Sequence, residues 1–286
     1  MAEQPRFLVV DGYAREGRED LAAGGATTAG ELYRQMLDRC TPGGAQVDIL
    51  CPADPDAALP QGAALAQYDG IAWTGSSLTI HQPDPKVTPQ IEFARAAFEA
   101  GVPSFGSCWA AQIAVVAAGG LCAVNPKGRE MGIARKIALT AEGRGHPLYF
   151  GKKTVFDAFI SHDDEITHLP PGGVLLASND HSMVQSVAVS HKGGTFWGLQ
   201  YHPEYDLHEL ARLCYCRKRK LTDKGFFRDM DAAQAFVDQL EALHQDPSRR
   251  DIAWLLGIDQ DVTNEDIRLV EVRNWIEQLV LPNMSR

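Results

Sequence analysis

The stretch G-V-P-S-F-G-S-C-W-A-A-Q, residues 101–112, joins a short apolar run to alanine-rich sequence, with a cysteine at the junction. The run predicts a strand and the alanine-rich part predicts a helix, so Cys108 lies at a strand-to-helix turn. Gly106 and Ala110, two residues before and after it, are small enough for strand and helix to cross closely. A helix N-terminus favours thiolate over thiol, which makes Cys108 a candidate nucleophile. A buried cysteine packed against alanines would have the same local sequence.

The sequence before this stretch alternates between strand and helix patterns. Apolar runs at 6–11, 47–50 and 70–74 predict strands, and residues 31–40 and 87–100 carry apolar side chains at helical spacing. Alternation in units of this length predicts right-handed β-α-β crossovers. We therefore predict an α/β fold, with a doubly wound, mostly parallel sheet and helices on both faces.

The second half of the chain has a different pattern of predicted elements. Between residues 121 and 200, short strand-like runs are separated by glycine and proline turns, which predicts a small antiparallel extension of the sheet. The rest of the chain has helical patterns, and the last of them, over 263–279, begins with Thr263 and Asp266 in a capping arrangement. We predict two units: an α/β domain over 1–206 and a helical C-terminal segment over 207–286 packed on it.

The composition excludes several classes of protein. The chain has 286 residues, of which 45% are hydrophobic and 22% charged, and its formal net charge is −10. These fractions are typical of a folded globular protein, and the negative charge disfavours non-specific binding to nucleic acid or to anionic membranes. No apolar run reaches the roughly 20 residues of a membrane helix, and the N-terminal M-A-E-Q-P-R lacks signal-peptide features. We expect a soluble, cytoplasmic protein that binds neither nucleic acid nor membrane.

The cysteines and acidic residues predict no metal site, and no cofactor is expected. The six cysteines are scattered, so reduced thiols are expected, and the close pair Cys214 and Cys216 lacks a second pair at zinc spacing. An acidic stretch near the C-terminus has a partial calcium-loop pattern, but Asn264 and Val270 stand where glycine and glutamate are needed. The basic run R-K-R-K at 217–220 is most simply the solvated end of a helix, where cations are favoured.

A second motif, F-W-G-L-Q-Y-H-P-E-Y-D at 196–206, supplies partners for the cysteine. A cysteine nucleophile needs a base within hydrogen-bond reach and a third group that orients this base. His202 ends an apolar strand pattern and is followed by Pro203 and Glu204. Because the residue before proline favours extended backbone, His202 and Glu204 are expected on the same side of the chain. Cys108, His202 and Glu204 are therefore a candidate catalytic triad.

With these motifs in this order, the chain resembles the class I (triad-type) glutamine amidotransferases, in the subgroup of the amidotransferase domain of GMP synthase. The resemblance covers roughly residues 6–206. It rests on G-S-C-W-A-A-Q for the cysteine, on G-L-Q-Y-H-P-E for the histidine and glutamate, and on W-T-G-S-S at 73–77 for an oxyanion loop. It implies the flavodoxin-like fold of that family.

The resemblance also implies a reaction, the hydrolysis of the glutamine side-chain amide to glutamate and ammonia. Cys108 would attack the amide carbon to give a γ-glutamyl thioester, His202 would move the protons, and Glu204 would orient His202. Backbone N–H groups of Trp109 and of the Gly75-Ser76 turn would stabilise the oxyanion. The family's substrate contacts fall here on Gln112, Ser161, His162 and Asp163.

Two departures from the family pattern leave the leaving group open. The oxyanion loop of the family is commonly G-G-P, whereas this chain has G-S-S with Ser76 in place of a glycine, and Ala110 replaces another glycine. A similar glycine-serine sequence occurs in relatives that hydrolyse γ-glutamyl peptides. We consider three functions: a stand-alone glutaminase that supplies ammonia to a separate synthase, a γ-glutamyl peptide or amide hydrolase with the same triad, and a non-catalytic binding protein of the same fold.

The expected partners follow from these functions. The substrate is a small molecule, glutamine or a γ-glutamyl compound. The chain has no P-loop, and its helical C-terminus is too short for an ATP pyrophosphatase, so an acceptor of ammonia would lie on a separate synthase subunit. The C-terminal helices either cover the core or mediate a homodimer, for which the candidate contacts are Trp254, Leu255, Leu256, Trp275 and Leu279.

Overall fold

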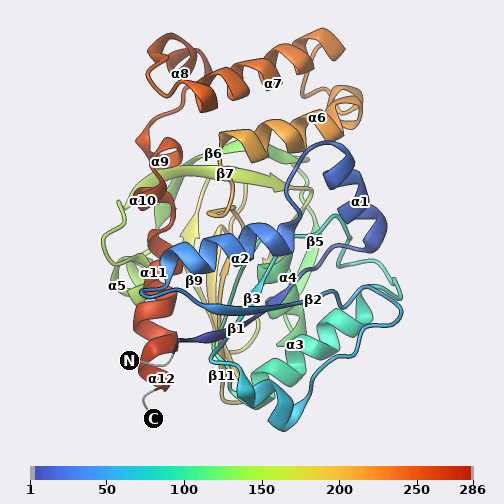
Figure 1. Cartoon of the computed structure of the whole chain (residues 1–286), viewed down its shortest axis with the longest axis vertical. Coiled ribbons are helices and arrows are strands. Elements are labelled where there is room, and N and C mark those ends of the chain that lie inside the picture. Colours follow the sequence, from blue (N-terminus) through green and yellow to red (C-terminus); the bar gives the residue numbers. More distant parts are fainter. Residues whose placement is uncertain (1–3, 285–286) are drawn as a thin grey trace.

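The computed structural model describes residues 4–284 and contains one large mixed sheet (Figure 1). Five of its strands are parallel: β1 (Arg6–Val10), β2 (Gln46–Leu50), β3 (Gly70–Trp73), β4 (Ser104–Ser107) and β11 (Gly194–Leu199). Four more continue the sheet in antiparallel pairs: β6 (Glu130–Leu139), β7 (Val155–His162), β9 (Gly173–Ser178) and β10 (Ser186–His191). The strand order is β2-β1-β3-β4-β11-β10-β9-β6-β7. A separate two-stranded sheet pairs β5 (Leu121–Val124) with β8 (Asp164–His168).

The parallel strands β1, β3, β4 and β11 are buried on both faces because they send side chains alternately into two cores, whereas the edge strand β2 is largely exposed. In β1, Phe7 and Val9 belong to one apolar cluster, whereas Leu8 and Val10 belong to the other. Parallel neighbours need crossover connections, which the intervening helices supply. The predicted doubly wound, mostly parallel α/β fold with an antiparallel extension is confirmed, and the extension is continuous with the parallel strands through β11 and β10.

Helices cover both faces of this sheet (Figure 1). α2 (Ala29–Cys40) and α11 (Val270–Trp275) pack on the face of Phe7, and α3 (Thr88–Ala100) and α4 (Trp109–Ala117) pack on the opposite face. The other helices are α1 (Arg15–Ala23), α5 (Ala141–Gly145), α6 (Leu207–Asp223), α7 (Met230–Gln245), α8 (Arg250–Leu256), α9 (Gln260–Thr263), α10 (Glu265–Arg268) and α12 (Leu281–Met284). Short 3-10 turns lie at Gly62–Gln67 and Pro147–Tyr149, and a π-helical turn lies at Ile276–Val280. Within residues 4–284, no helix combines the length and apolar character needed to span a membrane.

The end of the chain belongs to the core. Trp275 is fully buried, with its ring centroid 5.4 Å from that of Phe7 and 5.5 Å from that of Phe105. Trp275 is therefore not available as a contact between two copies of the chain. Trp254 and Leu255 on α8, in contrast, are strongly exposed.

The last helical pattern, predicted as one helix over 263–279, is divided in the structure. Thr263 ends α9, and the side chain of Asn264 accepts a hydrogen bond from the backbone N–H of Asp266 at 2.9 Å. The predicted capping by Thr263 is therefore wrong, because the amide oxygen of Asn264 satisfies the first free N–H groups of α10.

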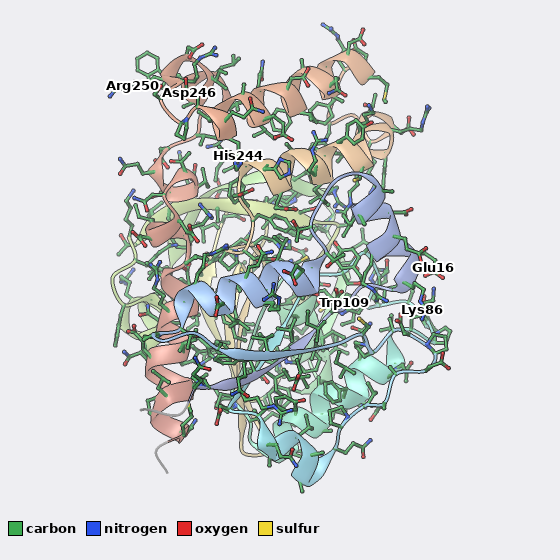
Figure 2. All side chains as sticks on the ribbon, in the orientation of Figure 1. Glu16, Lys86, Trp109, His244, Asp246 and Arg250 are labelled. Carbon is green, nitrogen blue, oxygen red and sulfur yellow. The ribbon has the colours of Figure 1, made fainter. Side chains whose placement is uncertain are left out.

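α6 and α7 form a pair at one end of the molecule (Figure 1). Their apolar side chains share a third cluster with those of α1 and α2. His244, Asp246 and Arg250 mark the outer end of this region in Figure 2, well away from Trp109 in the interior. The start of α6 follows directly on the His202 motif, and the Asp206 side chain caps it by accepting the N–H of Glu209 at 2.8 Å.

Candidate active site

Cys108 lies at the turn from β4 to α4 in a backbone conformation that residues other than glycine rarely adopt, with φ 54° and ψ −106°. A Cβ atom on Gly106 would lie 2.4 Å from the Cβ of Ala110 and 2.4 Å from the carbonyl oxygen of Trp73, so glycine is required where the strand passes the helix. Such strain costs about 1–3 kcal/mol and persists only where other contacts hold it. The N–H of Cys108 donates to the carbonyl of Leu199 at 2.6 Å. The expected strand-to-helix turn is thus present, tied to the neighbouring strand.

His202 and Glu204 lie in the turn after β11, and their side chains are joined. Nδ1 of His202 is 2.7 Å from Oε1 of Glu204, and both side chains are buried. The same carboxylate oxygen accepts a hydrogen bond from the Ser107 hydroxyl at 2.9 Å, and Ser107 accepts one from Tyr33 at 2.7 Å. The ring of Tyr205 stacks on His202 with a centroid separation of 4.2 Å. These contacts fix the imidazole plane, with Nε2 on the side away from the carboxylate.

The thiol of Cys108 lies beside this imidazole. Gly75 lies between these two residues. If it carried a Cβ atom, that atom would be 3.1 Å from Cε1 of His202 and 3.8 Å from Cβ of Cys108. Burial lowers the pKa of His202, but the Glu204 carboxylate and the Cys108 sulfur together outweigh it and raise the pKa to about 9. His202 therefore carries a proton at neutral pH. Its buried Nε2 makes no hydrogen bond of standard geometry to any group in residues 4–284.

The turn that contains Gly75 and Ser76 follows β3 and lies against Cys108. The hydroxyl of Ser76 donates to the carbonyl of Gly12 at 2.8 Å, which ties this turn to the loop after β1. The backbone of Ser76 does not adopt a positive φ, so serine is accommodated here without strain. The N–H of Trp109 is the first of α4 and has no acceptor within the helix. The structure thus brings the three predicted oxyanion donors to Cys108, and their role stays a prediction.

A cavity of about 110 Å³ opens at Cys108. It is lined by all four predicted substrate-binding residues, Gln112, Ser161, His162 and Asp163. The Cys108 thiol donates to the carbonyl of Ser161 at 3.5 Å. Gln112 donates from Nε2 to the carbonyl of Asp164 at 3.1 Å and to the side chain of Gln200 at 3.2 Å. These residues therefore surround the candidate nucleophile, and their contact with substrate stays a prediction.

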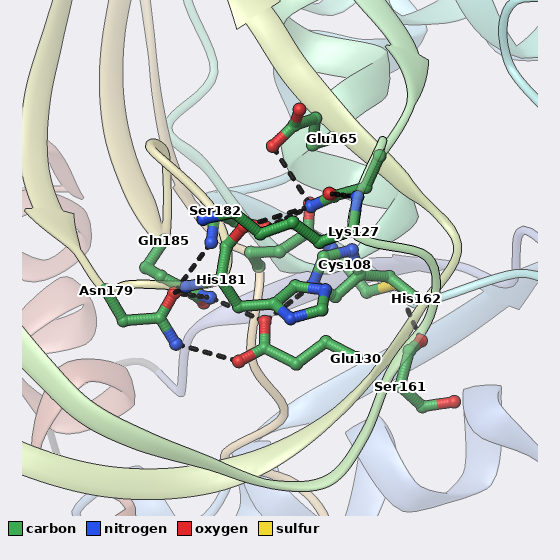
Figure 3. A network of polar contacts seen from close by, with 12 residues as sticks. Cys108, Lys127, Glu130, Ser161, His162, Glu165, Asn179, His181, Ser182 and Gln185 are labelled. Atoms are coloured by element: carbon green, nitrogen blue, oxygen red, sulfur yellow. Dashed lines mark hydrogen bonds and ion pairs between the residues drawn. The ribbon is translucent and has the colours of Figure 1, made fainter. Parts of the chain in front are cut away.

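A buried acid, which the sequence patterns did not reveal, supports one wall of this cavity. Figure 3 shows Glu130 of β6 beside His162, whose Nε2 is 3.0 Å from the carboxylate, and Asn179 and Gln185 donate to the same carboxylate at 2.7 and 2.8 Å. Burial raises the pKa of Glu130, but the contacts with His162 and the two amides bring it below its usual value. Nδ1 of His162 is 2.7 Å from the carbonyl of Asp164. The ionised Glu130 thus holds the corner between β7 and β8 in place.

Basic side chains, also absent from the predicted site, gather at the same cavity. Arg129 donates to the hydroxyl of Ser161 at 2.7 Å and pairs with Asp163 at 2.5 Å, and Arg217 donates to the same hydroxyl at 3.0 Å. Lys220 lies 3.7 Å from Asp163. Arg217 and Lys220 belong to the R-K-R-K run; the interpretation of this run as a solvated helix end is wrong for Arg217, whereas Lys220 is an exposed residue of the last turn of α6 that also lines the cavity. Their spacing of three residues places both on one helix face, but a solvated helix would have the same spacing, so no sequence signal identifies them.

The groups around the cavity suit an amino-acid substrate better than a metal ion. Within residues 4–284, no three His, Cys, Asp or Glu side chains are grouped so that they could hold a metal. The cavity offers guanidinium and ammonium groups for a carboxylate, and Asp163 and Asp164 for an ammonium group. The Cys108 thiol and the backbone of Ser76 and Trp109 line the same cavity, and the His202 imidazolium lies beside the thiol, which together is the set of groups needed for acyl transfer.

Comparison with known proteins identifies relatives along the whole chain. The family model of glutamine amidotransferase class-I matches residues 38–213. The chain is 35% identical to a γ-glutamyl-L-1-hydroxyisopropylamide hydrolase from a Pseudomonas species, over 99% of this chain and 96% of that protein. It is 28% identical to a glutamine-hydrolysing GMP synthase from a Nitratiruptor species, over 82% of this chain and 43% of the synthase. The chain thus spans less than half the length of that synthase.

Solved structures share the fold. A glutamine amidotransferase from Thermotoga maritima superposes with a TM-score of 0.64 over 97% of this chain and 99% of that one, at 15% identity. A protein described as a putative GMP synthase subunit from Thermoplasma acidophilum superposes with a TM-score of 0.55 over 78% of this chain, at 19% identity. At these identities the likeness concerns the fold alone.

Proposed function

The chain belongs to the class I glutamine amidotransferase family, and on this basis we propose that it hydrolyses the amide bond of γ-glutamyl compounds through a thioester on Cys108. The observation that carries the proposal is the meeting of Cys108 with the buried His202–Glu204 pair beside a cavity that is lined by charged groups of both signs. The full-length relative that is a γ-glutamyl-L-1-hydroxyisopropylamide hydrolase supports a γ-glutamyl amide as substrate. Glutamine is the simplest such amide.

The first step forms the thioester. Cys108 attacks the γ-carbonyl carbon of the substrate as the thiolate, its proton having passed to His202, and the amide C–N bond then breaks. With a pKa of about 9, His202 holds the proton that the leaving amine needs, so the amine departs in neutral form. Glu204 keeps the imidazole in place and stabilises its protonated state through the 2.7 Å contact at Nδ1.

The second step releases glutamate. Water attacks the thioester carbon, His202 accepts its proton as a general base, and the C–S bond breaks to restore Cys108. Each step passes through a tetrahedral intermediate with a negative oxygen, for which the backbone N–H groups of Trp109 and of the Gly75-Ser76 turn are the proposed donors. Removing one such donor costs about 10²–10³ in rate in comparable enzymes.

A second candidate is a glutaminase that supplies ammonia to a separate synthase. The relatives among GMP synthases support it, because those proteins are named as glutamine-hydrolysing and are more than twice as long as the part that this chain matches. The separate subunit that would accept the ammonia is part of this second candidate. The two candidates share every step at Cys108 and differ in the amine that leaves.

We also propose that the predicted division at residue 206 separates two units that share one site. Residues 1–206 would carry the triad, and the helical segment 207–286 would contribute binding groups. Arg217 and Lys220 on α6 support this division of roles, since both line the cavity at Cys108.

The proposal is tested by mass spectrometry and by kinetics. An electrophilic glutamine analogue should label the wild-type protein on Cys108 and leave the Cys108→Ser variant unlabelled. Steady-state rates should then be compared for glutamine and a panel of γ-glutamyl amides. A preference for glutamine of about a hundredfold or more, equivalent to about 2.7 kcal/mol in transition-state binding, would favour the glutaminase. Absence of both labelling and turnover would point to a non-catalytic binding protein.

A further inference from the structure

A second, larger cavity adjoins the one at Cys108. Its volume is about 760 Å³, and the two cavities share Thr79, Arg129, Asp163 and Asp164 in their walls. A substrate that holds its γ-carbonyl at Cys108 can therefore extend past these residues into the outer cavity. Release of ammonia requires no space of this size, whereas a larger amine does. The outer cavity is thus available to whatever a substrate carries beyond its γ-glutamyl group.

The two cavities together carry more positive than negative charge. Their cations are Lys127, Arg129, Arg217, Lys220 and Lys224, and their carboxylates are Asp163 and Asp164. Asp163 pairs with Arg129 at 2.5 Å and with Lys224 at 2.6 Å, and Asp164 pairs with His81 at 3.2 Å. The excess of positive charge is local to the cavities, because the whole chain has a formal net charge of −10. A γ-glutamyl group brings one α-carboxylate and one α-ammonium, so its binding leaves the excess unchanged.

Two of these cations have no carboxylate partner in the part of the chain that the structure describes. Lys127 donates to the carbonyl oxygen of Asp180 and stands exposed at the outer cavity. Arg217 donates to the hydroxyl groups of Ser161 at 3.0 Å and Tyr13 at 3.3 Å. No carboxylate of the described residues therefore offsets either cation, and Lys127 lines the outer cavity whereas Arg217 lines the inner one.

The outer cavity also has an apolar part. Val124 and Phe226 line it, and 58% and 40% of their surfaces are exposed. Exposed apolar side chains beside Lys127 suit a ligand with a few carbon atoms next to an anionic group. An amino acid joined through its amine to the γ-carboxyl of glutamate has this composition.

We propose that the outer cavity receives the amine part of the substrate and selects amines that bear a carboxylate, so that the substrates are γ-glutamyl amino acids. This inference rests on the proposed function and specifies its substrate class. The added carboxylate would meet Lys127, which has no carboxylate partner in the part of the chain that the structure describes, and Lys224, which it would share with Asp163; the excess positive charge would attract the anionic substrate from solution. The reaction stays a hydrolysis: water and the γ-glutamyl amino acid give glutamate and the free amino acid.

A pair of matched substrates tests this inference. γ-Glutamylglycine and γ-glutamylglycinamide have nearly the same shape, but only the first bears a carboxylate on its amine part. We expect kcat/KM to be at least about tenfold higher for γ-glutamylglycine at low ionic strength, and this ratio to fall as salt screens the charges. Lys127→Gln and Lys224→Gln should each lower the ratio about threefold to tenfold.

Lys218→Gln is the matched control. Lys218 lies on the same helix as Lys220, but its ammonium donates to Gln234 at 3.2 Å and it lines neither cavity, so the ratio should not change. Equal rates for the two substrates, a preference for the glycinamide, or an equal response to all three variants would overturn the inference while leaving the proposed function intact. Failure to hydrolyse either compound would overturn both, and activity on glutamine alone would then favour the glutaminase.

Discussion

Two buried charged clusters in this protein differ in how completely their polar atoms are hydrogen-bonded. Around Glu271, the polar atoms are paired: Nζ of Lys152 lies 2.9 Å from Oε2, and the Tyr201 hydroxyl donates to Oε1 at 2.7 Å. Around His202, Oε2 of Glu204 is buried without a hydrogen-bond partner in the part of the chain that the structure describes, and Nε2 of the imidazole has only the adjacent Cys108 sulfur, outside standard hydrogen-bond geometry. An unsatisfied buried polar group costs about 1–3 kcal/mol. In the first cluster the loss of one partner would therefore be costly to stability, whereas the second cluster is maintained at a cost to stability.

The places of the two clusters in the fold explain this difference. Glu271 lies on α11, whose Trp275 fills the core between Phe7 and Phe105, where water and ligands have no access. Cys108 and His202 lie at the carboxyl ends of β4 and β11, where a doubly wound sheet opens to a crevice. Groups that must bind and react with a substrate cannot have all their hydrogen bonds made by the protein itself. The contrast between the two clusters can be tested by substitution in each.

The largest expected effect is the loss of activity in Cys108→Ala. Without the sulfur, no thioester can form, so we expect kcat/KM for γ-glutamyl substrates to fall by about 10³-fold or more. The free energy of unfolding should change by less than about 1 kcal/mol, because within residues 4–284 the thiol makes one hydrogen bond of standard geometry, to the carbonyl of Ser161. Steady-state kinetics and urea unfolding measure the two quantities. Retained activity would show that Cys108 is not the nucleophile.

Glu271→Ala should have the opposite profile. Removal of one partner leaves the Lys152 ammonium buried and uncompensated, which typically costs about 3–5 kcal/mol in the free energy of unfolding. Activity per folded molecule should stay near that of the wild type. Glu265→Ala, which breaks an exposed pair with Arg39 at 2.8 Å, is the matched control and should cost at most about 1 kcal/mol. Equal losses in the two variants would contradict the structural role assigned to Glu271.

Glu204→Gln should change both the rate and its pH dependence. The carboxylate raises the pKa of His202, so its removal should lower that pKa from about 9 and move the alkaline limb of kcat/KM to lower pH. We expect kcat/KM at neutral pH to fall about 10²-fold. A pH–rate profile of the variant with an unshifted alkaline limb would show that His202 does not set that limb.

The same pair should make stability depend on pH. Because the folded pKa of His202 lies above its ordinary value of 6.5, the attraction to Glu204 stabilises the fold fully below about pH 6.5 and is lost as the pH rises through about 9. The free energy of unfolding of the wild type should therefore decline over this range more steeply than that of Glu204→Gln, as measured by urea unfolding at each pH.

The smallest effect is expected from Glu130→Gln, which tests a positioning residue. The amide keeps the shape of the side chain but weakens its hold on His162, so the corner between β7 and β8 should become less well ordered. We expect KM to rise about threefold to tenfold with little change in kcat. A fall in kcat at constant KM would instead implicate Glu130 in the chemical steps.

Much of the fold was predictable because it depends on patterns within short segments. The alternation of strands and helices, the small residues around Cys108 and the two-residue spacing of His202 and Glu204 are all visible in the sequence. The start of α10 was misplaced by one residue because Thr263 and Asn264 are both good capping residues, and only the folded backbone shows which side chain reaches the free N–H groups.

The supporting residues of the site were not predictable in this way. Glu130 and His162 are separated by 32 positions, and Arg217 and Ser161 by 56, and no local pattern links either pair. Arg217 and Lys220 have the helical spacing of an exposed face, and the same spacing would occur in a solvated helix. Their place at the cavity depends on how α6 packs against the sheet.

The sequence by itself determined the α/β fold class, the order of the motifs and the candidate triad, because backbone preferences and turn geometry are set within a few residues. Only the tertiary structure decided that Trp275 is a core residue, that Glu130 supports the cavity wall, and that basic side chains gather beside Cys108. Burial and charge pairing arise from contacts between distant segments, and these contacts exist only once the chain has folded.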